Sequence, residues 1–440
     1  MNARALRLAV LVLAAAVAIG TTAESLRAAD KPAPKPVPPK APPAELVIQG
    51  GRILTVSGPP IEEGAILVRE GKIVEVGERV HAGERARRID ARGKVVIPGM
   101  IDAYTRLGLV EISLVSSTVD DDEGSEPVTP QVRALDSFNP LGRAIAYTRE
   151  HGITCALVAP RAGTAAANVI AGQSAVLKLS GASADQMLLK SPGGVHVTLG
   201  EGPKSRFRDR SRAPVTRMGE AALLRAALSE GKEYADAWKR YEEKRKTDPG
   251  AAKPPDRDLK KEAMADVVSG RMPLFVHCHR ADDILTALRV AQEFGVRPIL
   301  VHATEGYKVA SEIARSGVSV IVGPVSTTPD RMETLEVNPE NPAILARAGV
   351  RIAITTAESH LVSHLPYEAG LAAASGLPAE EALRAITLSP AQILGVADRV
   401  GSIEPGKDAD LVILDGDPLE IITHVEWVFI GGELVYRRGA

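Results

Sequence analysis

Hydrophobic and polar positions alternate at short spacing near both ends of the chain. Runs such as ELVIQG, GAILVREG and KIVEVG, and later ADLVILDG and VEWVFIGG, are separated by turns that contain glycine. This pattern predicts short antiparallel strands. Because either half alone would leave an apolar face uncovered, we expect residues 45–97 and 399–440 to form one small composite β-sandwich domain.

Between the two ends, over residues 98–398, predicted strands alternate with segments of helical periodicity. The segment DDILTALRVAQEF places four apolar residues on one helical face, namely Ile284, Leu288, Ala291 and Phe294. The alternation is typical of parallel βα units and predicts an α/β fold with a (βα)8 TIM-like barrel. The eight predicted strands end near Tyr104, Ala159, Leu179, Leu199, His277, His302, Gly323 and Thr356.

A charged segment interrupts the barrel pattern from about residue 220 to 261. It is dense in Lys, Arg, Glu and Asp and contains DPGAAKPPD near its middle. We expect two helices joined by a proline turn, on the mouth or the flank of the barrel. Such a composition is typical of a solvated surface, and a substrate-binding or partner-binding role is the alternative.

The first residues have the pattern of an export signal. Arg4 and Arg7 precede an apolar run, and small residues follow it up to Ala23. We expect residues 1–23 to be a signal peptide cleaved after Ala23, with an uncleaved anchor as the alternative. Other permissive cleavage positions follow at Ala28 and Ala29.

Residues 24–44 contain the run KPAPKPVPPKAPP, which favours an extended and solvated linker. With the signal removed, the protein is expected to be periplasmic or extracellular and not bound to a membrane.

Composition is that of a large globular protein. The chain has 440 residues, of which 45% are hydrophobic and 25% charged, enough for a barrel and a smaller domain. Its 53 basic and 55 acidic residues leave a net charge of −2, so no nucleic-acid partner is expected. Two cysteines, Cys155 and Cys278, are too few for a disulfide scaffold. No glycine-rich nucleotide fingerprint and no serine-nucleophile motif is present.

Three histidines gather at the ends of two neighbouring predicted strands. PLFVHCHRADDI places His277 and His279 on one side of a strand, because side chains two residues apart share a face, and PILVHATEGY ends the next strand with His302. Imidazole is the commonest metal ligand, so the pattern predicts a metal site with His277 and His302, and with His279 as an alternate. In the structural alternative, hydrogen bonds to nearby carboxylates satisfy the histidines, namely those of Asp282, Asp283 and Glu305.

Other polar features carry weaker signals. The glycine-containing loop around Asn168, Gly172 and Gln173 either contacts a ligand or is a simple turn. The acidic run over residues 120–123 lacks the spacing of a calcium loop and is interpreted as solvated. Four histidines without a comparable setting are interpreted as structural or exposed, namely His81, His151, His196 and His424.

Several of these motifs together resemble the amidohydrolase superfamily, in particular its imidazolonepropionase-like branch. They are VVIPGMID, VHCHRADD, VHATEGY and the C-terminal LSPAQILGVADRVGSIEPGKDADLVILDGDP. The resemblance implies a metal-bearing βα barrel with a β-sandwich from both termini, and a hydrolase that acts on C–N bonds other than peptide bonds. In such enzymes a divalent metal, usually zinc, activates a water molecule, and an aspartate takes its proton.

The chain departs from the ligand pattern that the resemblance implies. The first-strand His-x-His pair falls on Tyr104 and Arg106, and the aspartate of the eighth strand falls on Ala357, whereas His277 and His302 match the fifth-strand and sixth-strand ligands. An arginine is permanently cationic and repels a metal, and a tyrosine coordinates only as phenolate. We therefore expect either a weakly held divalent metal, zinc first, or none, and no catalytic residue is assigned.

Two functions follow from this departure. The first is an impaired hydrolase whose site is rearranged around the remaining histidines, with help from Glu358, His360 or His364. The second is a catalytically silent protein that binds a small, carboxylated ligand, or that forms a homo-oligomer or a hetero-oligomer with an active homologue. The residues expected to contact a ligand are Tyr104, Arg106, Arg280, Glu305 and Tyr307.

Overall fold

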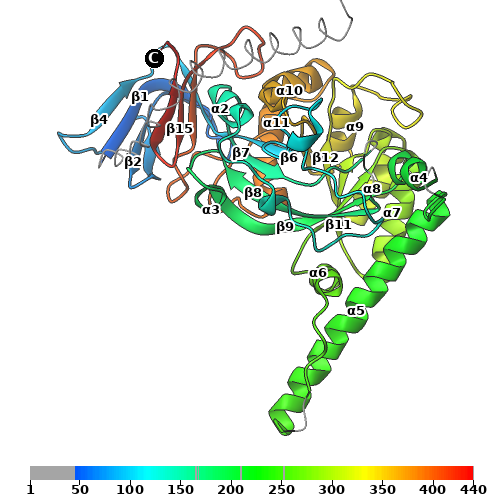
Figure 1. Ribbon diagram of the computed structural model, residues 1–440. Coiled ribbons are helices and arrows are strands. Elements are labelled where there is room, and N and C mark those ends of the chain that lie inside the picture. Colours follow the sequence, from blue (N-terminus) through cyan, green and yellow to red (C-terminus); the bar gives the residue numbers. More distant parts are fainter. Residues whose placement is uncertain (1–44, 164–165, 167, 209–210, 251–252, 440) are drawn as a thin grey trace, which may run out of the picture. The chain divides into compact units, whose positions relative to one another are not determined.

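The two ends of the chain meet in one eight-stranded sheet in the computed structural model (Figure 1), which describes residues 45–439 except 164–165, 167, 209–210 and 251–252. The predicted signal peptide and proline-rich linker lie outside the described residues and stay predictions. No helix in the described part of the chain combines the length and apolarity that a bilayer crossing requires.

Within this terminal sheet, β5 (Val95–Pro98) pairs antiparallel with β14 (Leu411–Leu414), so backbone hydrogen bonds join the two halves directly. Apolar side chains of the sheet, among them Ile48 and Phe429, form a buried cluster of their own. The strand order is β16-β15-β14-β5-β1-β2-β3, with β4 paired to β1. The other strands are β1 (Glu45–Ile53), β2 (Ile61–Arg69), β3 (Lys72–Gly77), β4 (Arg87–Asp90), β15 (Val425–Ile430) and β16 (Glu433–Arg437).

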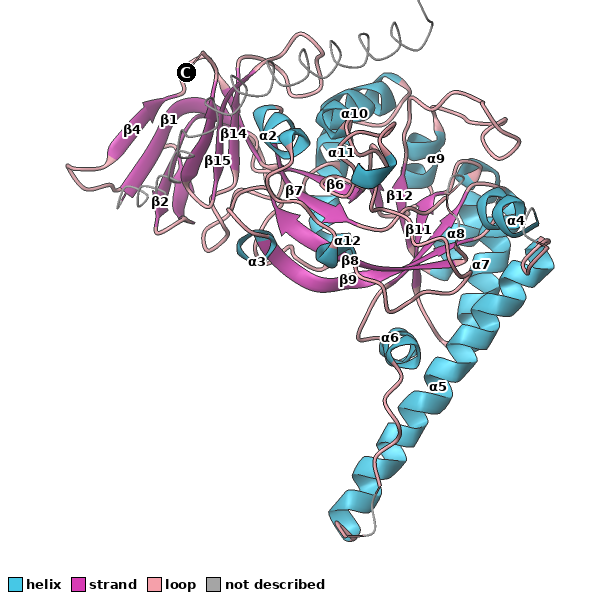
Figure 2. Cartoon of the chain, viewed as in Figure 1, coloured by secondary structure: helices cyan, strands magenta, loops and turns pink. Residues whose placement is uncertain are grey.

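A second eight-stranded sheet curves into a nearly closed barrel (Figure 2), which confirms the predicted fold class. Its strands follow the order of the sequence, and each lies where the sequence predicts a strand. They are β6 (Met100–Thr105), β7 (Ile153–Val158), β8 (Ile170–Lys178), β9 (Leu188–Thr198), β10 (Leu274–Cys278), β11 (Pro298–His302), β12 (Ser319–Val322) and β13 (Ile352–Ile354).

One barrel strand runs against the expectation of parallel βα units. β8 pairs antiparallel with both β7 and β9. In the described residues, the connection from β8 to β9 holds only the one-turn helix α3 (Ala184–Met187). Antiparallel strands need no crossover helix, and hydrophobic periodicity carries no information about strand direction.

The remaining helices cover the barrel. α7 (Ala281–Phe294) buries Ile284 and Ala291, and Leu288 and Phe294 pack partly buried against the same core, which confirms the predicted helical face. Gly295 ends this helix with a left-handed φ of 67°. The other barrel helices are α2 (Arg143–Glu150), α4 (Glu201–Arg208), α8 (Ala310–Ser316), α9 (Asn341–Arg347), α10 (Leu365–Ala374), α11 (Ala379–Ala385) and α12 (Leu388–Leu394).

The charged insertion folds as the predicted pair of helices with wider bounds. α5 (Arg217–Thr247) has 31 residues, and α6 (Leu259–Val268) lies beside it (Figure 1). The two helices approach closely at Gly231, where an added Cβ would lie 2.6 Å from the carbonyl carbon of Met264. Beyond Tyr234, α5 buries no side chain, as expected for a solvated charged helix.

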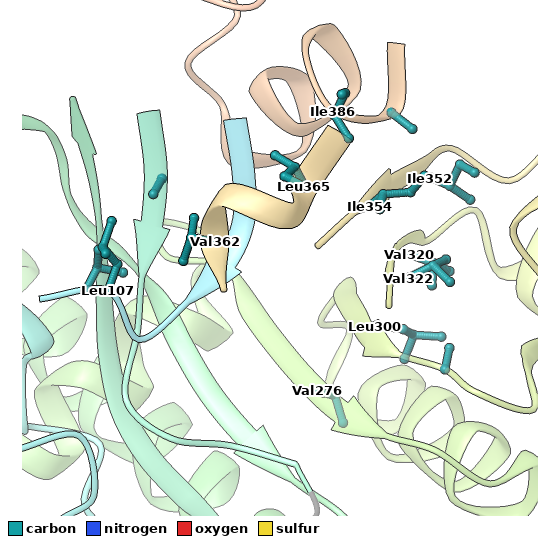
Figure 3. Close-up of a cluster of buried hydrophobic side chains, with 14 of the residues drawn as sticks. Leu107, Val276, Leu300, Val320, Val322, Ile352, Ile354, Val362, Leu365 and Ile386 are labelled. Carbon is teal, nitrogen blue, oxygen red and sulfur yellow. The ribbon is translucent and has the colours of Figure 1, made fainter. Parts of the chain in front are cut away.

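Successive side chains of the barrel strands point to opposite sides of the sheet. Val276, Leu300 and Val320 belong to the large cluster between strands and helices (Figure 3), whereas Phe275 and Val301 belong to the separate cluster on the inner side. The same alternation directs His277, two residues after Phe275, to the inside of the barrel.

A buried carboxylate joins the first and last barrel strands. Asp102 of β6 accepts hydrogen bonds from the hydroxyls of Thr355 and Thr356, each at 2.5 Å, and from the backbone N–H of Tyr104 at 3.2 Å. Its side chain is fully buried. Burial raises the pKa of Asp102 to about 6, although these hydrogen bonds partly oppose the shift.

Replacing Asp102 with asparagine is expected to make stability less dependent on pH. Because the folded-state pKa lies above the unfolded value, Asp102 contributes most below pH 4, and its contribution falls as pH rises through 6. Between pH 4.5 and 7.5 the natural protein should lose about 2 kcal/mol relative to Asp102→Asn. Denaturant unfolding of both proteins at the two pH values measures this difference, and a difference that does not change with pH would contradict it.

Candidate functional site

Three imidazoles form a continuous hydrogen-bonded chain at the carboxyl ends of β9, β10 and β11. Nδ1 of His196 lies 2.9 Å from Nε2 of His277, and Nδ1 of His277 lies 3.2 Å from Nε2 of His302. The chain ends where Nδ1 of His302 meets the carbonyl oxygen of Gly323 at 2.8 Å. We refer to His196, His277 and His302 as the histidine chain.

The carbonyl of Gly323 fixes the direction of every bond in the histidine chain. A carbonyl only accepts, so His302 donates from Nδ1 and must accept at Nε2. His277 then donates from Nδ1 and accepts at Nε2, where His196 donates in turn. All three rings are therefore neutral Nδ1–H tautomers. Nε2 of His196 is left as a buried lone pair with no partner among the described residues.

Backbone strain places His302 in the chain. Val301 before it faces the inner side, so a regular strand would turn His302 outward. His302 and Ala303 instead have φ values of 68° and 43°, a conformation that residues with side chains rarely adopt. This distortion lets the ring of His302 reach that of His277.

Burial keeps the histidine chain uncharged. It lowers the pKa of His196 to about 3 and that of His277 well below the usual range, where the neighbouring imidazoles add to the effect. It lowers the pKa of His302 to about 4, with a partial opposing effect from the hydrogen bond to Gly323 and a further decrease from the charge of Arg106. The rings are neutral at physiological pH, as their bonding pattern requires.

His279 lies beside the histidine chain. Its Nδ1 is 2.8 Å from the hydroxyl of Thr304, and its ring stacks on His302 with a centroid distance of 4.6 Å. Its Nε2 is buried and has no hydrogen-bond partner in the described part of the chain. The three histidines that the sequence predicts to meet are therefore together, with His196 as a fourth.

The ring of Tyr104 fills the space in front of the histidine chain. It is 1% exposed, and its centroid lies 4.5 Å from that of His277 and 5.8 Å from those of His196 and His302. The hydroxyl accepts the N–H of Ala162 at 2.9 Å. Burial raises the pKa of Tyr104 to about 12, so the phenol of the metal-free protein is protonated at neutral pH.

Arg106 is held by two carboxylates at the mouth of the barrel. Its guanidinium contacts Asp121 at 3.0 Å and Glu358 at 3.3 Å, and its side chain is 17% exposed. Asp121 is fully buried and also receives two hydrogen bonds from Arg161, at 2.9 and 3.2 Å. The acidic run predicted to be solvated therefore provides the central acceptor of a buried ion-pair network.

The eighth strand provides no aspartate, and its neighbours are engaged elsewhere. Ala357, with a φ of 55°, packs against the inner apolar cluster that contains Tyr104. Glu358 pairs with Arg106, and Nε2 of His360 lies 2.8 Å from the carbonyl oxygen of Glu111. His364 is an exposed residue near Tyr367.

Three residues expected to contact a ligand have partners outside the histidine chain. Arg280 pairs with Asp282 at 2.9 Å, and Glu305 accepts the N–H of Ala281 and pairs with Lys308. The hydroxyl of Tyr307 donates to the backbone of Glu336 at 3.1 Å. Asp282 and Asp283 likewise pair with arginines rather than with the histidines.

The polar loop around Asn168 contacts the chain itself. The Asn168 amide donates to the backbone of Glu123 and Glu126, and Gln173 donates to the backbone of Pro130 at 2.9 Å. At Gly172 an added Cβ would lie 2.5 Å from the carbonyl oxygen of Val132, so this glycine permits a close backbone approach. Gly172 and Gln173 lie in strand β8 and not in a loop, and the side chains of Asn168 and Gln173 bond to the backbone and to Thr129.

Sequence reasoning missed His196, Asp121 and Arg161. His196 and Thr198 share the face of β9 that lies beside His277, because the register pairs Phe275 with His196. The strand itself is predicted from sequence, so the alternation of side chains between its two faces was the signal that could have placed His196 inside the barrel. No comparable signal exists for Asp121 and Arg161, because both lie in irregular loops.

The residues present do not fit a metal as they are arranged. No group of three or more His, Cys, Asp or Glu side chains that could hold a metal ion occurs within the described residues. Both nitrogens of His277 and His302 are committed to the histidine chain. A cavity next to His302 has only about 10 Å³, room for about one water molecule. A cavity of about 420 Å³ lies elsewhere, between α5, α6 and residues 126–130.

The fold combines an eight-stranded barrel with a sheet built from both halves of the chain. Polar residues gather at the carboxyl ends of the barrel strands, which is where the active sites of barrel enzymes lie. The sequence model of the amidohydrolase family matches residues 95–435. The chain belongs to the amidohydrolase family, and the predicted resemblance is confirmed.

Individual relatives agree with this assignment. The imidazolonepropionase of Symbiobacterium thermophilum is 26% identical, over 84% of this chain and 91% of its own. The amidohydrolase tasK of Hapsidospora irregularis is also 26% identical over 84% of this chain, which spans only 39% of that longer protein. The crystal structure of an amidohydrolase from Thermotoga maritima MSB8 is 35% identical, with a TM-score of 0.82, and the match covers 89% of this chain and 100% of that one.

Proposed function

We propose that this chain is a member of the amidohydrolase family that has lost metal-dependent hydrolysis and works as an exported binding or structural protein. One observation carries the proposal: the ring of Tyr104 lies against the histidine chain with its hydroxyl bonded to Ala162, and the guanidinium of Arg106 is paired with Asp121 and Glu358. Metal-dependent hydrolysis needs an open coordination position and a base for the water proton. The residues at the first and eighth strands supply neither.

A rearranged hydrolytic site finds little support in the geometry. Glu358 is the nearest replacement for the missing aspartate in sequence, but its carboxylate pairs with Arg106. The cation beside that carboxylate also repels a metal. His360 is bonded through both ring nitrogens, to Ser359 and to Glu111.

Hydrolysis assays test the proposal. The purified full-length protein, supplied with zinc, manganese, cobalt or iron(II), should cleave no amide, cyclic amide or amino-heterocycle faster than metal-containing buffer does. Metal-dependent turnover that disappears in His277→Ala would contradict the proposal. A matched substitution of the exposed His81, which is 93% exposed, serves as the control and should change nothing.

The noncatalytic role that we propose is assembly rather than capture of a carboxylate at Arg106. A carboxylated ligand at Arg106 would compete with Glu358 and with the buried Asp121, which already pair with its guanidinium. Thermal-shift screening of amino acids, dipeptides and heterocyclic acids should therefore find no stabiliser that depends on Arg106. A stabiliser lost in Arg106→Ala would favour the ligand-binding role, and co-purification of a second amidohydrolase would favour assembly.

Export is proposed on the N-terminal sequence alone. Cell fractionation of the native protein should place it outside the cytoplasm, with a new N-terminus after Ala23, Ala28 or Ala29. Recovery of the intact chain from the cytoplasm would contradict this part of the proposal.

A further inference from the structure

We propose that residues Pro160–Gly163, which we call the clasp, seal the histidine chain, and that Tyr104 and Arg106 now serve to hold the clasp in place. The clasp follows β7 and leads from the rim of the barrel across the histidines. This proposal deepens the proposed loss of activity, and its functional meaning rests on that proposed function. Its contacts are independent of that proposal.

The first anchor is the hydroxyl of Tyr104. It accepts the N–H of Ala162 at 2.9 Å and lies 3.3 Å from the carbonyl oxygen of Ala162 and 3.4 Å from that of Pro160. The phenol thus satisfies backbone groups of the clasp where the barrel has no ladder partner for them. Leaving a buried backbone N–H without a partner is unfavourable, so this anchor favours the closed position.

The second anchor is the carboxylate of Asp121. Arg161 of the clasp binds it through Nε and Nη2, and its backbone N–H donates to the carbonyl oxygen of Asp121 at 2.6 Å. Arg106 binds the same carboxylate from the barrel side at 3.0 Å. Asp121 therefore couples the clasp to Arg106, because both guanidinium groups bind the same fully buried carboxylate.

The third anchor brings the clasp onto the imidazoles. The N–H of Gly163 donates to the hydroxyl of Thr198 at 3.1 Å. A Cβ on Gly163 would lie 2.9 Å from Nε2 of His302 and 3.6 Å from Nε2 of His279, and its φ is 90°. Only glycine fits here, because a side chain would clash with the ring and would strain the backbone.

These three anchors explain the two departures at the first strand together. An imidazole at position 104 would not place a hydroxyl where the N–H of Ala162 donates, and an imidazole at position 106 would not present a guanidinium to the carboxylate of Asp121. The substitutions and the seal are therefore one unit, in which residues at former ligand positions close the mouth.

Tyr104→Phe and Arg161→Ala, singly and combined, test the clasp. In Tyr104→Phe, amide exchange at Ala162, resolved by mass spectrometry with fragmentation, should be at least about tenfold faster, because the ring stays and only the acceptor is lost. In the double variant, carbethoxylation of His279 and His302 by diethyl pyrocarbonate should be at least about tenfold faster, because the seal no longer excludes the reagent.

Two controls separate the clasp from general loosening. Arg133→Ala removes an exposed ion pair with Asp136 and should leave exchange at Ala162 unchanged, and His81 should react at the same rate in every variant. Unchanged exchange at Ala162 in a folded Tyr104→Phe protein would overturn the proposal, and this single variant decides the matter should the double variant unfold. Neither readout depends on hydrolysis, so failure of the clasp and failure of the proposed function are distinguishable.

Discussion

A variant that combines Tyr104→His, Arg106→His and Ala357→Asp is expected to bind zinc on the order of a hundredfold more tightly than the natural chain, because it raises the number of available ligands from two to five. The change removes the phenol that lies against the histidine chain and the guanidinium that pairs with Asp121. Position 357 tolerates aspartate, since its φ of 55° lies in the left-handed region that Asp adopts more readily than Ala.

Zinc binding by this triple variant is measured by competition with a chromophoric chelator. The same variant with His302→Ala added is the matched control and should lose most of the gain. A folded triple variant that binds zinc no better than the natural chain would show that the loss of ligands is not what prevents binding. If Nε2 of His302 were to hold zinc, it would have to release its hydrogen bond to His277.

Replacing Asp408 with asparagine is expected to lower the free energy of unfolding by about 3 kcal/mol. Asp408 is 4% exposed and pairs with Lys72 of β3, with Lys178 of β8 and with Arg399 of the segment between α12 and β14. Burial opposes its ionisation, but the hydrogen bonds from Arg399 and Lys72 and the charge of Lys178 hold the pKa of Asp408 well below its usual range.

Denaturant unfolding at pH 7 measures this loss. Because the folded-state pKa of Asp408 is depressed, the contribution is present at neutral pH and is lost only in strong acid, so the two proteins should converge as pH falls. Asp136→Asn, which breaks only an exposed pair with Arg133, is the control and should not change stability. Equal stability of Asp408→Asn and the natural protein would mean that the three cations are satisfied without it.

The sequence predicts the strands of this fold well because each is marked by an apolar run and a turn. It could not predict that β8 is reversed, since the same run of buried residues fits either direction. The sequence likewise identifies His277, His279 and His302, because the apolar runs that precede them place them at the ends of predicted strands. The place of His302 in the histidine chain depends on a distorted strand end, which the residue pattern does not predict.

The polar contacts that close the site escape prediction for a related reason. Asp121 and Arg161 meet across loops that are forty positions apart, and their pairing depends on three-dimensional closure rather than on spacing. Arg106 and Tyr104 are recognisable from sequence as departures from a ligand pattern. Their new partners, Asp121 and Ala162, are visible only in the folded chain.

Metal content tests the central claim most directly, namely that the site has exchanged its metal for contacts within the protein. The natural chain, expressed with added zinc, manganese and iron and purified without chelators, should hold less than about a tenth of an equivalent of any of them by elemental mass spectrometry, because two histidines alone bind metal weakly. Near-stoichiometric metal that survives dialysis and disappears in His277→Ala would contradict the account.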